Sequence, residues 1–264
     1  MQVSSLAFRT DLALLRLGGS QIEEHDSYLL VRTPDNPTYW WGNCLLLDPA
    51  RWTPSEAIGL FEAEFPDAQH VAIGFDGPAV DPAQLSGYAD AGLVLEHSVA
   101  MTTATVNPPP RPQAIAALRP FVEESDWAQR VELTCAVNTD HEPEAHRAFA
   151  TAKAASDRRL AEGTGGSWFG AFIDGRLVSE LGVIPTGDGL ARYQSVETHP
   201  DFRGRGLAGS LVHYAGAIAL RDYDAKTLVM VADPDYLACR VYQSVGFAIT
   251  EHVWAAAHHR PVAT

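Results

Sequence analysis

The 264-residue sequence predicts an α/β protein organised in two domains. Three observations support this fold class. Patterns typical of strands and of helices alternate along the second part of the chain. A proline-rich segment at residues 107–113 separates that part from the first. The two flanking parts, residues 1–106 and 114–264, each have a length that is usual for one domain.

The separating segment reads Asn107-Pro108-Pro109-Pro110-Arg111-Pro112-Gln113. Prolines at this density cannot occupy a helix interior or a central strand, so we expect a stiff linker. In the first domain the patterns predict strands at 28–32, 39–47, 70–75 and 93–103 and a helix at 55–65.

In the second domain, residues typical of helix starts and of turns mark the ends of the elements more clearly. Ser125-Asp126 and Pro143 are typical of helix starts, and Asp174-Gly175 is a favoured hairpin turn. The predicted order is strand 115–121, helices 125–137 and 143–162, strands 168–173, 176–184 and 191–198, a helix from 207, strand 227–232, helix 236–245 and strand 247–255.

The charge of the sequence limits the classes of molecule that the protein is expected to bind. The net charge is −14, and residues 1–106 hold 14 acidic but only 4 basic residues. Such a field repels nucleic acid and anionic membranes and attracts cationic small molecules. No apolar run approaches the length of a bilayer span, and no targeting segment is indicated. The three cysteines, Cys44, Cys135 and Cys239, are far apart, which is typical of reduced thiols in a cytoplasmic protein.

Residues 196–209 are the most informative stretch. A strand pattern leads into two glycines set between two arginines, and an apolar helix pattern starts at Leu207. That order brings free backbone N–H groups and the positive end of a helix dipole together, which suits a phosphate or a pyrophosphate. At Gly204 and Gly206 the missing side chains let the phosphates approach the backbone.

The same loop spells the dinucleotide fingerprint Gly204-x-Gly206-x-x-Gly209, so a nicotinamide-dependent oxidoreductase is one alternative. Two observations count against it. Residues 198–203 separate the strand from the glycines, and residues 210–264 are too few for the units that complete a doubly wound sheet.

A second motif makes the comparison specific. Residues 203–208 match the pattern Arg/Gln-x-x-Gly-x-Gly/Ala, and Ala238, Tyr242 and Gly246-Phe247 match Ala-x-x-x-Tyr followed by Gly-Phe. Over residues 113–255 the chain resembles the GNAT superfamily of acyl-CoA-dependent N-acyltransferases. Asp235 stands where the family usually has Asn. The first domain suggests a degenerate copy of the same plan.

The resemblance implies a mixed, mostly antiparallel central sheet flanked by helices in each of two domains, with the catalytic domain second. It implies an N-acetyltransferase that moves an acetyl or short acyl group from acetyl-CoA to a primary amine of a small-molecule acceptor by direct attack. A catalytically silent acyl-CoA-binding module is the alternative. The cofactor-binding residues it implies are Val196, Glu197, Thr198, Arg203, Gly204, Arg205, Gly206, Leu207, Ala208, Gly209 and Asp235.

Acyl transfer to an amine needs a base, an oxyanion donor and a proton for the departing thiolate. The resemblance assigns the thiolate's proton to Tyr242. Glu197 is the candidate base, with Glu180, His199 or a water chain as rivals, and the oxyanion donor is the backbone N–H of Thr198 or its neighbour. No metal is expected, because the histidines of His141-Glu142-Pro143-Glu144-Ala145-His146 lack the i,i+4 spacing of a helical zinc site.

Overall fold

The computed structural model describes residues 1–77, 80–138 and 142–259. It forms two compact units. Unit 1 comprises residues 1–100 together with residues from 250 onward, and unit 2 comprises residues 101–249. Two strands, β5 (Val94–Thr103) and β11 (Ala248–His259), contribute residues to both units.

Unit 1 contains α1 (Leu6–Leu17), β1 (Gln21–Glu24), β2 (Tyr28–Arg32), β3 (Cys44–Leu47), α2 (Pro54–Glu64), β4 (His70–Phe75) and α3 (Ser86–Asp90), with 3-10 turns at Trp40–Gly42, Pro49–Arg51 and Pro82–Leu85. Its strands follow the order β1-β2-β3-β4-β11. Only β3 and β4 are parallel among these pairs, and both are fully buried runs, as expected for strands covered on both faces.

The strand β11 completes the sheet of unit 1. It pairs antiparallel with β4 from Trp254↔Phe75 to His259↔His70. The compact units therefore differ from the domains expected from the linker, because residues 250–259 join the first unit rather than the second. The linker residues 107–113 lie within unit 2.

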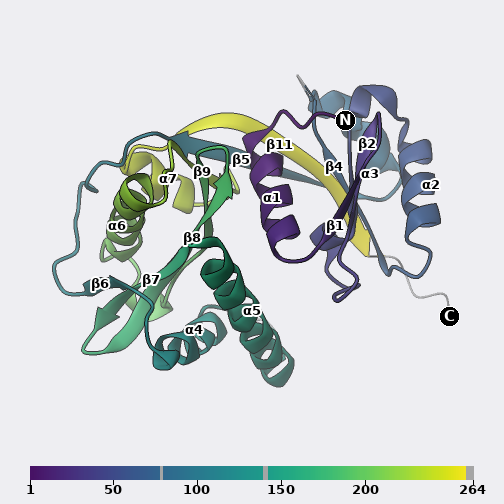
Figure 1. Cartoon of the computed structure of the whole chain (residues 1–264). Coiled ribbons are helices and arrows are strands. Elements are labelled where there is room, and N and C mark those ends of the chain that lie inside the picture. The colour runs from purple at the N-terminus through teal and green to yellow at the C-terminus, as the bar shows by residue number, and fades with distance from the viewer. Residues whose placement is uncertain (78–79, 139–141, 260–264) are drawn as a thin grey trace. The chain divides into compact units, whose positions relative to one another are not determined.

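Unit 2 contains β6 (Ala117–Pro120), α4 (Glu124–Val137), α5 (Pro143–Thr164), β7 (Ser167–Ile173), β8 (Arg176–Gly187), β9 (Leu190–Thr198), a 3-10 turn (Pro200–Phe202), α6 (Leu207–Asp222), β10 (Thr227–Ala232) and α7 (Ala238–Ser244). Its strands follow the order β10-β9-β8-β7-β6, and all pairs are antiparallel except β9 with β10. Helix α6 packs on one face of this sheet, and α4 and α5 pack on the other (Figure 1).

The predicted fold class is confirmed, since both units combine a mixed sheet with flanking helices. Three details differ from the sequence prediction. Helices α1 and α3 and strand β1 were not predicted, residues 39–47 form a 3-10 turn before β3, and α4 is capped by Glu123 with Asp126 rather than by Ser125. Among the described residues, no helix combines the length and the hydrophobicity that a bilayer crossing requires.

Candidate active site

The strands β9 and β10 separate part-way along their length. Their parallel pairing runs from Thr227↔Leu190 to Val229↔Arg192 and ends there. A cavity of about 70 Å³ follows, lined by Tyr193, Gln194, Ser195, Val196, Met230, Val231 and Tyr242. We call this cavity the wedge.

A β-bulge in β9 shapes one wall of the wedge. The register with β8 changes from Gly182↔Gln194 to Glu180↔Glu197, so β9 carries one extra residue between these pairs. Within the bulge Ser195 has a φ of 48°, a conformation uncommon for a residue with a side chain. Because a bulge bends its strand and leaves one residue unpaired, it provides backbone groups that face away from the ladder.

The glycine loop leads into α6. Gly206 is the N-cap of this helix, and both Gly204 and Gly206 have a φ of 74°. A Cβ atom on Gly206 would lie 2.3 Å from the carbonyl oxygen of Arg111, while a Cβ on Gly204 would meet open space. The close approach of phosphates is therefore not the only reason for these two glycines. Gly206 is also required by the linker, whose Gln113 N–H donates to Ser210 Oγ at 3.0 Å.

Both arginines of the loop fold back on the residues before it. Arg203 Nε donates to the carbonyl of Thr198 at 3.2 Å, and Arg205 Nη2 donates to the carbonyl of Asp201 at 2.9 Å. The Arg205 guanidinium also lies 5.0 Å from the centre of the Phe202 ring. These contacts fix two positive charges beside the N-terminus of α6.

Tyr242 reaches the wedge from α7. Its side chain is buried, and burial raises its pKa, so the phenol keeps its proton at neutral pH. Its hydroxyl has no hydrogen-bond partner among the described residues. Asp235 precedes α7 as an exposed residue, and its backbone N–H donates to Asp233 Oδ1 at 2.9 Å. Asp235 is not among the residues that line the wedge.

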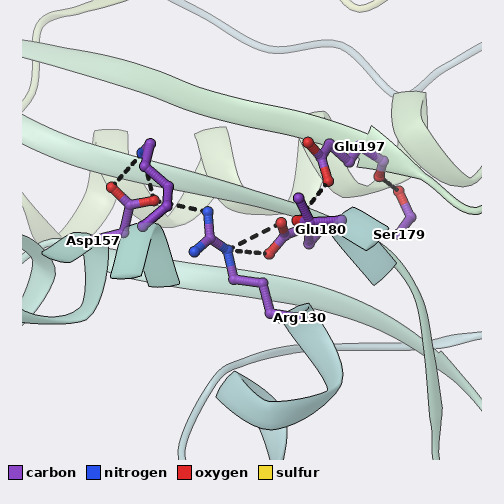
Figure 2. A network of polar contacts seen from close by, with 7 residues as sticks. Arg130, Asp157, Ser179, Glu180 and Glu197 are labelled. Atoms are coloured by element: carbon purple, nitrogen blue, oxygen red, sulfur yellow. Dashed lines mark hydrogen bonds and ion pairs between the residues drawn. The ribbon is translucent and has the colours of Figure 1, made fainter. Parts of the chain in front are cut away.

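Glu197 takes part in a polar network on the face of the sheet that α4 and α5 cover (Figure 2). Its Oε2 accepts a hydrogen bond from Thr134 Oγ1 at 3.0 Å, and burial raises its pKa. Ser179 Oγ donates to the carbonyl oxygen of Glu197 at 2.7 Å. This carboxyl group is therefore partly enclosed and favours its neutral form more than a solvated one does.

The two rival bases are placed differently. Glu180 is fully buried, and both its carboxylate oxygens accept from Arg130 Nε, at 3.0 and 2.8 Å. His199 belongs to the loop before α6, where the Asp201 N–H donates to its Nδ1 at 3.3 Å and Arg176 Nη2 lies 2.8 Å from its Nε2. Both ring nitrogens of His199 are therefore engaged by neighbouring residues, so this side chain helps to hold the loop.

Sequence reasoning missed the residues around Glu180. These are Arg130 and Thr134 on α4 and Lys153 and Asp157 on α5. One signal existed, because Asp157 falls on the same helical face as the buried alanines at 150, 154 and 161. A charged residue at such a position indicates a buried partner.

Residues 127–247 match the model of the acetyltransferase (GNAT) family. This segment is a GNAT acetyltransferase domain. It contains the glycine loop, the wedge and the polar network, and the resemblance found in the sequence is thereby confirmed. No curated protein is similar enough in sequence to match the chain.

Solved structures resemble the chain over most of its length, beyond the GNAT domain. A GCN5-related N-acetyltransferase from Kribbella flavida has 17% identity and a TM-score of 0.65, and the alignment covers 97% of this chain and 96% of that one. A tandem GNAT protein from the clavulanic acid biosynthesis pathway has 15% identity and a TM-score of 0.60, covering 95% and 89%. A conserved protein of unknown function from Staphylococcus epidermidis has 12% identity and a TM-score of 0.73, covering 90% and 93%. At these identities the likeness establishes the fold.

Unit 1 has a parallel strand pair as well, but its described residues differ there from the GNAT domain. The pairing of β3 with β4 reaches Leu47↔Phe75, and the Asp76 N–H then donates to Leu47 O at 3.0 Å. The following helix, α2, is capped by its own Thr53 and Glu56. In the described part of unit 1, β3 and β4 therefore stay paired up to their ends, and the N-terminus of α2 is capped by side chains.

The histidine-containing segment 141–146 is only partly described, since His141 lies outside the described residues. His146 lies on α5, with Nε2 3.4 Å from the carbonyl oxygen of Thr134. Within the described ranges, no group of three or more His, Cys, Asp or Glu residues is arranged to hold a metal ion.

Proposed function

We propose that the GNAT domain transfers an acetyl or other short acyl group from acetyl-CoA to a primary amine of a small molecule by direct attack. The observation that carries this proposal is the wedge, where β9 leaves β10 beside the glycine loop and Tyr242 enters from α7. An extended pantetheine chain needs such unpaired strand backbone, and a pyrophosphate needs the neighbouring helix N-terminus.

In this proposal the backbone of Val196, Glu197 and Thr198 binds the pantetheine arm as an added strand would. The amides of Gly204, Arg205, Gly206, Leu207, Ala208 and Gly209 hold the pyrophosphate, and Arg203 and Arg205 add positive charge. Asp235, an exposed residue of the turn before α7, contributes at most through its loop.

Two side chains move protons. Glu197 takes the proton of the attacking amine, directly or through water, because it combines a raised pKa with a less enclosed position than Glu180. Tyr242 donates its phenolic proton to the departing thiolate, since its hydroxyl is free for a ligand and stays protonated at neutral pH. The oxyanion is stabilised by the Thr198 N–H, because the N–H of its neighbour His199 already donates to Val178 O at 2.9 Å.

Ligand binding and turnover test this function separately. We expect acetyl-CoA and CoA, but not NAD, to raise the thermal unfolding temperature of the protein, as ligands of the native state do. An amine panel with mass-spectrometric detection should then identify acylated products. Stabilisation by NAD alone would overturn the proposal, and binding of acetyl-CoA without turnover of any amine would favour a silent binding module.

A further inference from the structure

The polar network around Glu197 contains more negative than positive groups. Its carboxyl groups are Asp157, Glu180 and Glu197, and its cations are Arg130 and Lys153 (Figure 2). Burying an uncompensated charge is costly. A network with three carboxyl groups and two cations therefore favours the uptake of one proton.

The contacts decide which carboxyl group keeps that proton. Asp157 lies between both cations, because its Oδ2 accepts from Arg130 Nη2 at 2.7 Å and its Oδ1 from Lys153 Nζ at 2.5 Å. The charge of Asp157 is therefore compensated by two cations. Among the described residues, Glu180 accepts hydrogen bonds only from the Nε–H of Arg130, which its two oxygens share, and it is fully buried.

Arg130 is itself held in place by packing. Its guanidinium lies 4.8 Å from the centre of the Trp168 ring, and that ring occupies the space of a missing side chain at Gly182. A Cβ on Gly182 would come within 2.6 Å of the Trp168 ring. The cation is therefore fixed toward Glu180 and Asp157 and makes no ion pair with Glu197 among the described residues.

Glu180 and Glu197 are direct cross-strand partners on β8 and β9. Side chains of such partners lie close together on one face of the sheet. The other groups that act on Glu197 are Arg130 and the Thr134 hydroxyl from α4, and Lys153 and His146 from α5. Burial, together with the neighbouring charges of Glu197 and Asp157, raises the pKa of Glu180 to about 8, against the attraction of Arg130.

We propose that Glu180 is a positioning residue for Glu197. The two carboxyl groups form one coupled unit that holds a single proton at neutral pH, and Glu180 carries it. Glu197 thereby presents an ionised carboxylate to the acceptor amine. The last step rests on the proposed role of Glu197 as the base, while the coupling itself does not.

Carboxyl titration by carbon-13 NMR of the full-length, glutamate-labelled protein tests the coupling without any turnover. In the wild type we expect Glu197 to titrate first and Glu180 near pH 8. Removing the charge of Glu197, which titrates first, should lower the midpoint of Glu180 by about one pKa unit or more. The variant Glu197→Gln should therefore lower the Glu180 midpoint by that amount, and Glu180→Gln should abolish the alkaline step.

A matched control is available at the start of α4. Asp126 is also fully buried and paired with an arginine, Arg119, at 2.7 Å, but it is not a partner of Glu180 or Glu197. The variant Asp126→Asn should leave both midpoints in place. An unchanged Glu180 midpoint in Glu197→Gln, or ionised Glu180 beside protonated Glu197 at pH 7, would overturn the inference. If Glu180→Gln does not fold, the Glu197→Gln titration still decides it.

The pH profile of kcat/KM separates this inference from the proposed function. If Glu197 is the base, the wild type should show an inflection near pH 8 that is absent from Glu180→Gln. Coupled titrations combined with full turnover by Glu197→Gln would support the carboxyl pair and refute the base role of Glu197.

Discussion

At the scale of the residue, Tyr242 is the group whose role in turnover can best be separated from binding. Tyr242 lines the wedge, and its hydroxyl makes no hydrogen bond among the described residues. We expect Tyr242→Phe to lower kcat by about 10²-fold, because a positioned general acid contributes at least this much. The dissociation constant of CoA, measured by calorimetry, should change little.

The control for this substitution is Tyr236→Phe, since Tyr236 is exposed in the turn just before α7. That change should leave kcat unaltered. An unaltered kcat in Tyr242→Phe itself would remove the proposed acid role and direct attention to a water as the proton donor.

The residues of the glycine loop, and Val196 and Tyr242 of the wedge, could be predicted from the sequence because each belongs to a local motif. Gly206 and Tyr242 are examples, as each has a characteristic spacing to its neighbours. Arg130 and Asp157 could not be predicted in the same way. Arg130 meets Glu180 across 50 positions and Asp157 across 27, so only tertiary packing brings these residues together.

At the scale of the element, the two glycines before α6 should respond differently to substitution. Gly204→Ala should reduce the free energy of unfolding by about 1–2 kcal/mol, the cost of a left-handed backbone for a residue with a Cβ. Gly206→Ala should cost distinctly more, because its Cβ would also overlap the Arg111 carbonyl. Urea unfolding of both variants measures the difference. Equal losses in the free energy of unfolding would show that the linker moves away from the new Cβ without an energetic penalty.

The helix α1 offers a second test at this scale. The Glu251 carboxylate of β11 accepts from Ser5 Oγ at 2.7 Å and from the Leu6 N–H at 2.9 Å, so it caps this helix from the far end of the sequence. We expect Glu251→Gln to reduce the free energy of unfolding by about 1 kcal/mol, since the negative charge favours the helix N-terminus.

The comparison variant is Glu24→Gln, whose carboxylate pairs with Arg16 on the surface. Exposed pairs contribute about 0–1 kcal/mol, so this change should have little effect. Denaturant titrations that give the same loss for both variants would contradict the capping role. No pattern in the sequence links Glu251 to α1, because the two segments are separated by almost the whole chain.

At the scale of the whole molecule, the buried Glu180 predicts a pH dependence of stability. Its pKa of about 8 in the folded protein exceeds the ordinary value of 4.5, so the native state holds a proton that the unfolded chain releases. The stabilisation is complete below about pH 4.5 and is lost as the pH rises toward 8, by at most about 1.4 kcal/mol per pH unit.

Unfolding free energies measured from pH 5 to 8 should therefore decline more steeply for the wild type than for Glu180→Gln. The amide has no proton to lose in this range, which removes the contribution of this one group. Parallel curves for the two proteins would mean that Glu180 is already ionised in the native state at pH 5.

The fold class was predictable because alternating strand and helix patterns depend on local sequence. The boundaries of the compact units were not, since the proline-rich segment looked like a domain boundary. In the structure it packs against Gly206 and Ser210, and the final strand joins the first unit. A proline-rich linker that packs against a neighbouring element has the same composition as one that makes no contacts, so the sequence does not distinguish the two.

The pairing of β11 with β4 sets the order in which the protein is completed during synthesis. Residues 1–100 emerge from the ribosome first, yet their sheet lacks β11 until residues 254–259 have been made. The edge of β4 stays open during that interval, and open strand edges are prone to pair with other chains. Translation therefore finishes the GNAT domain first and the amino-terminal unit last.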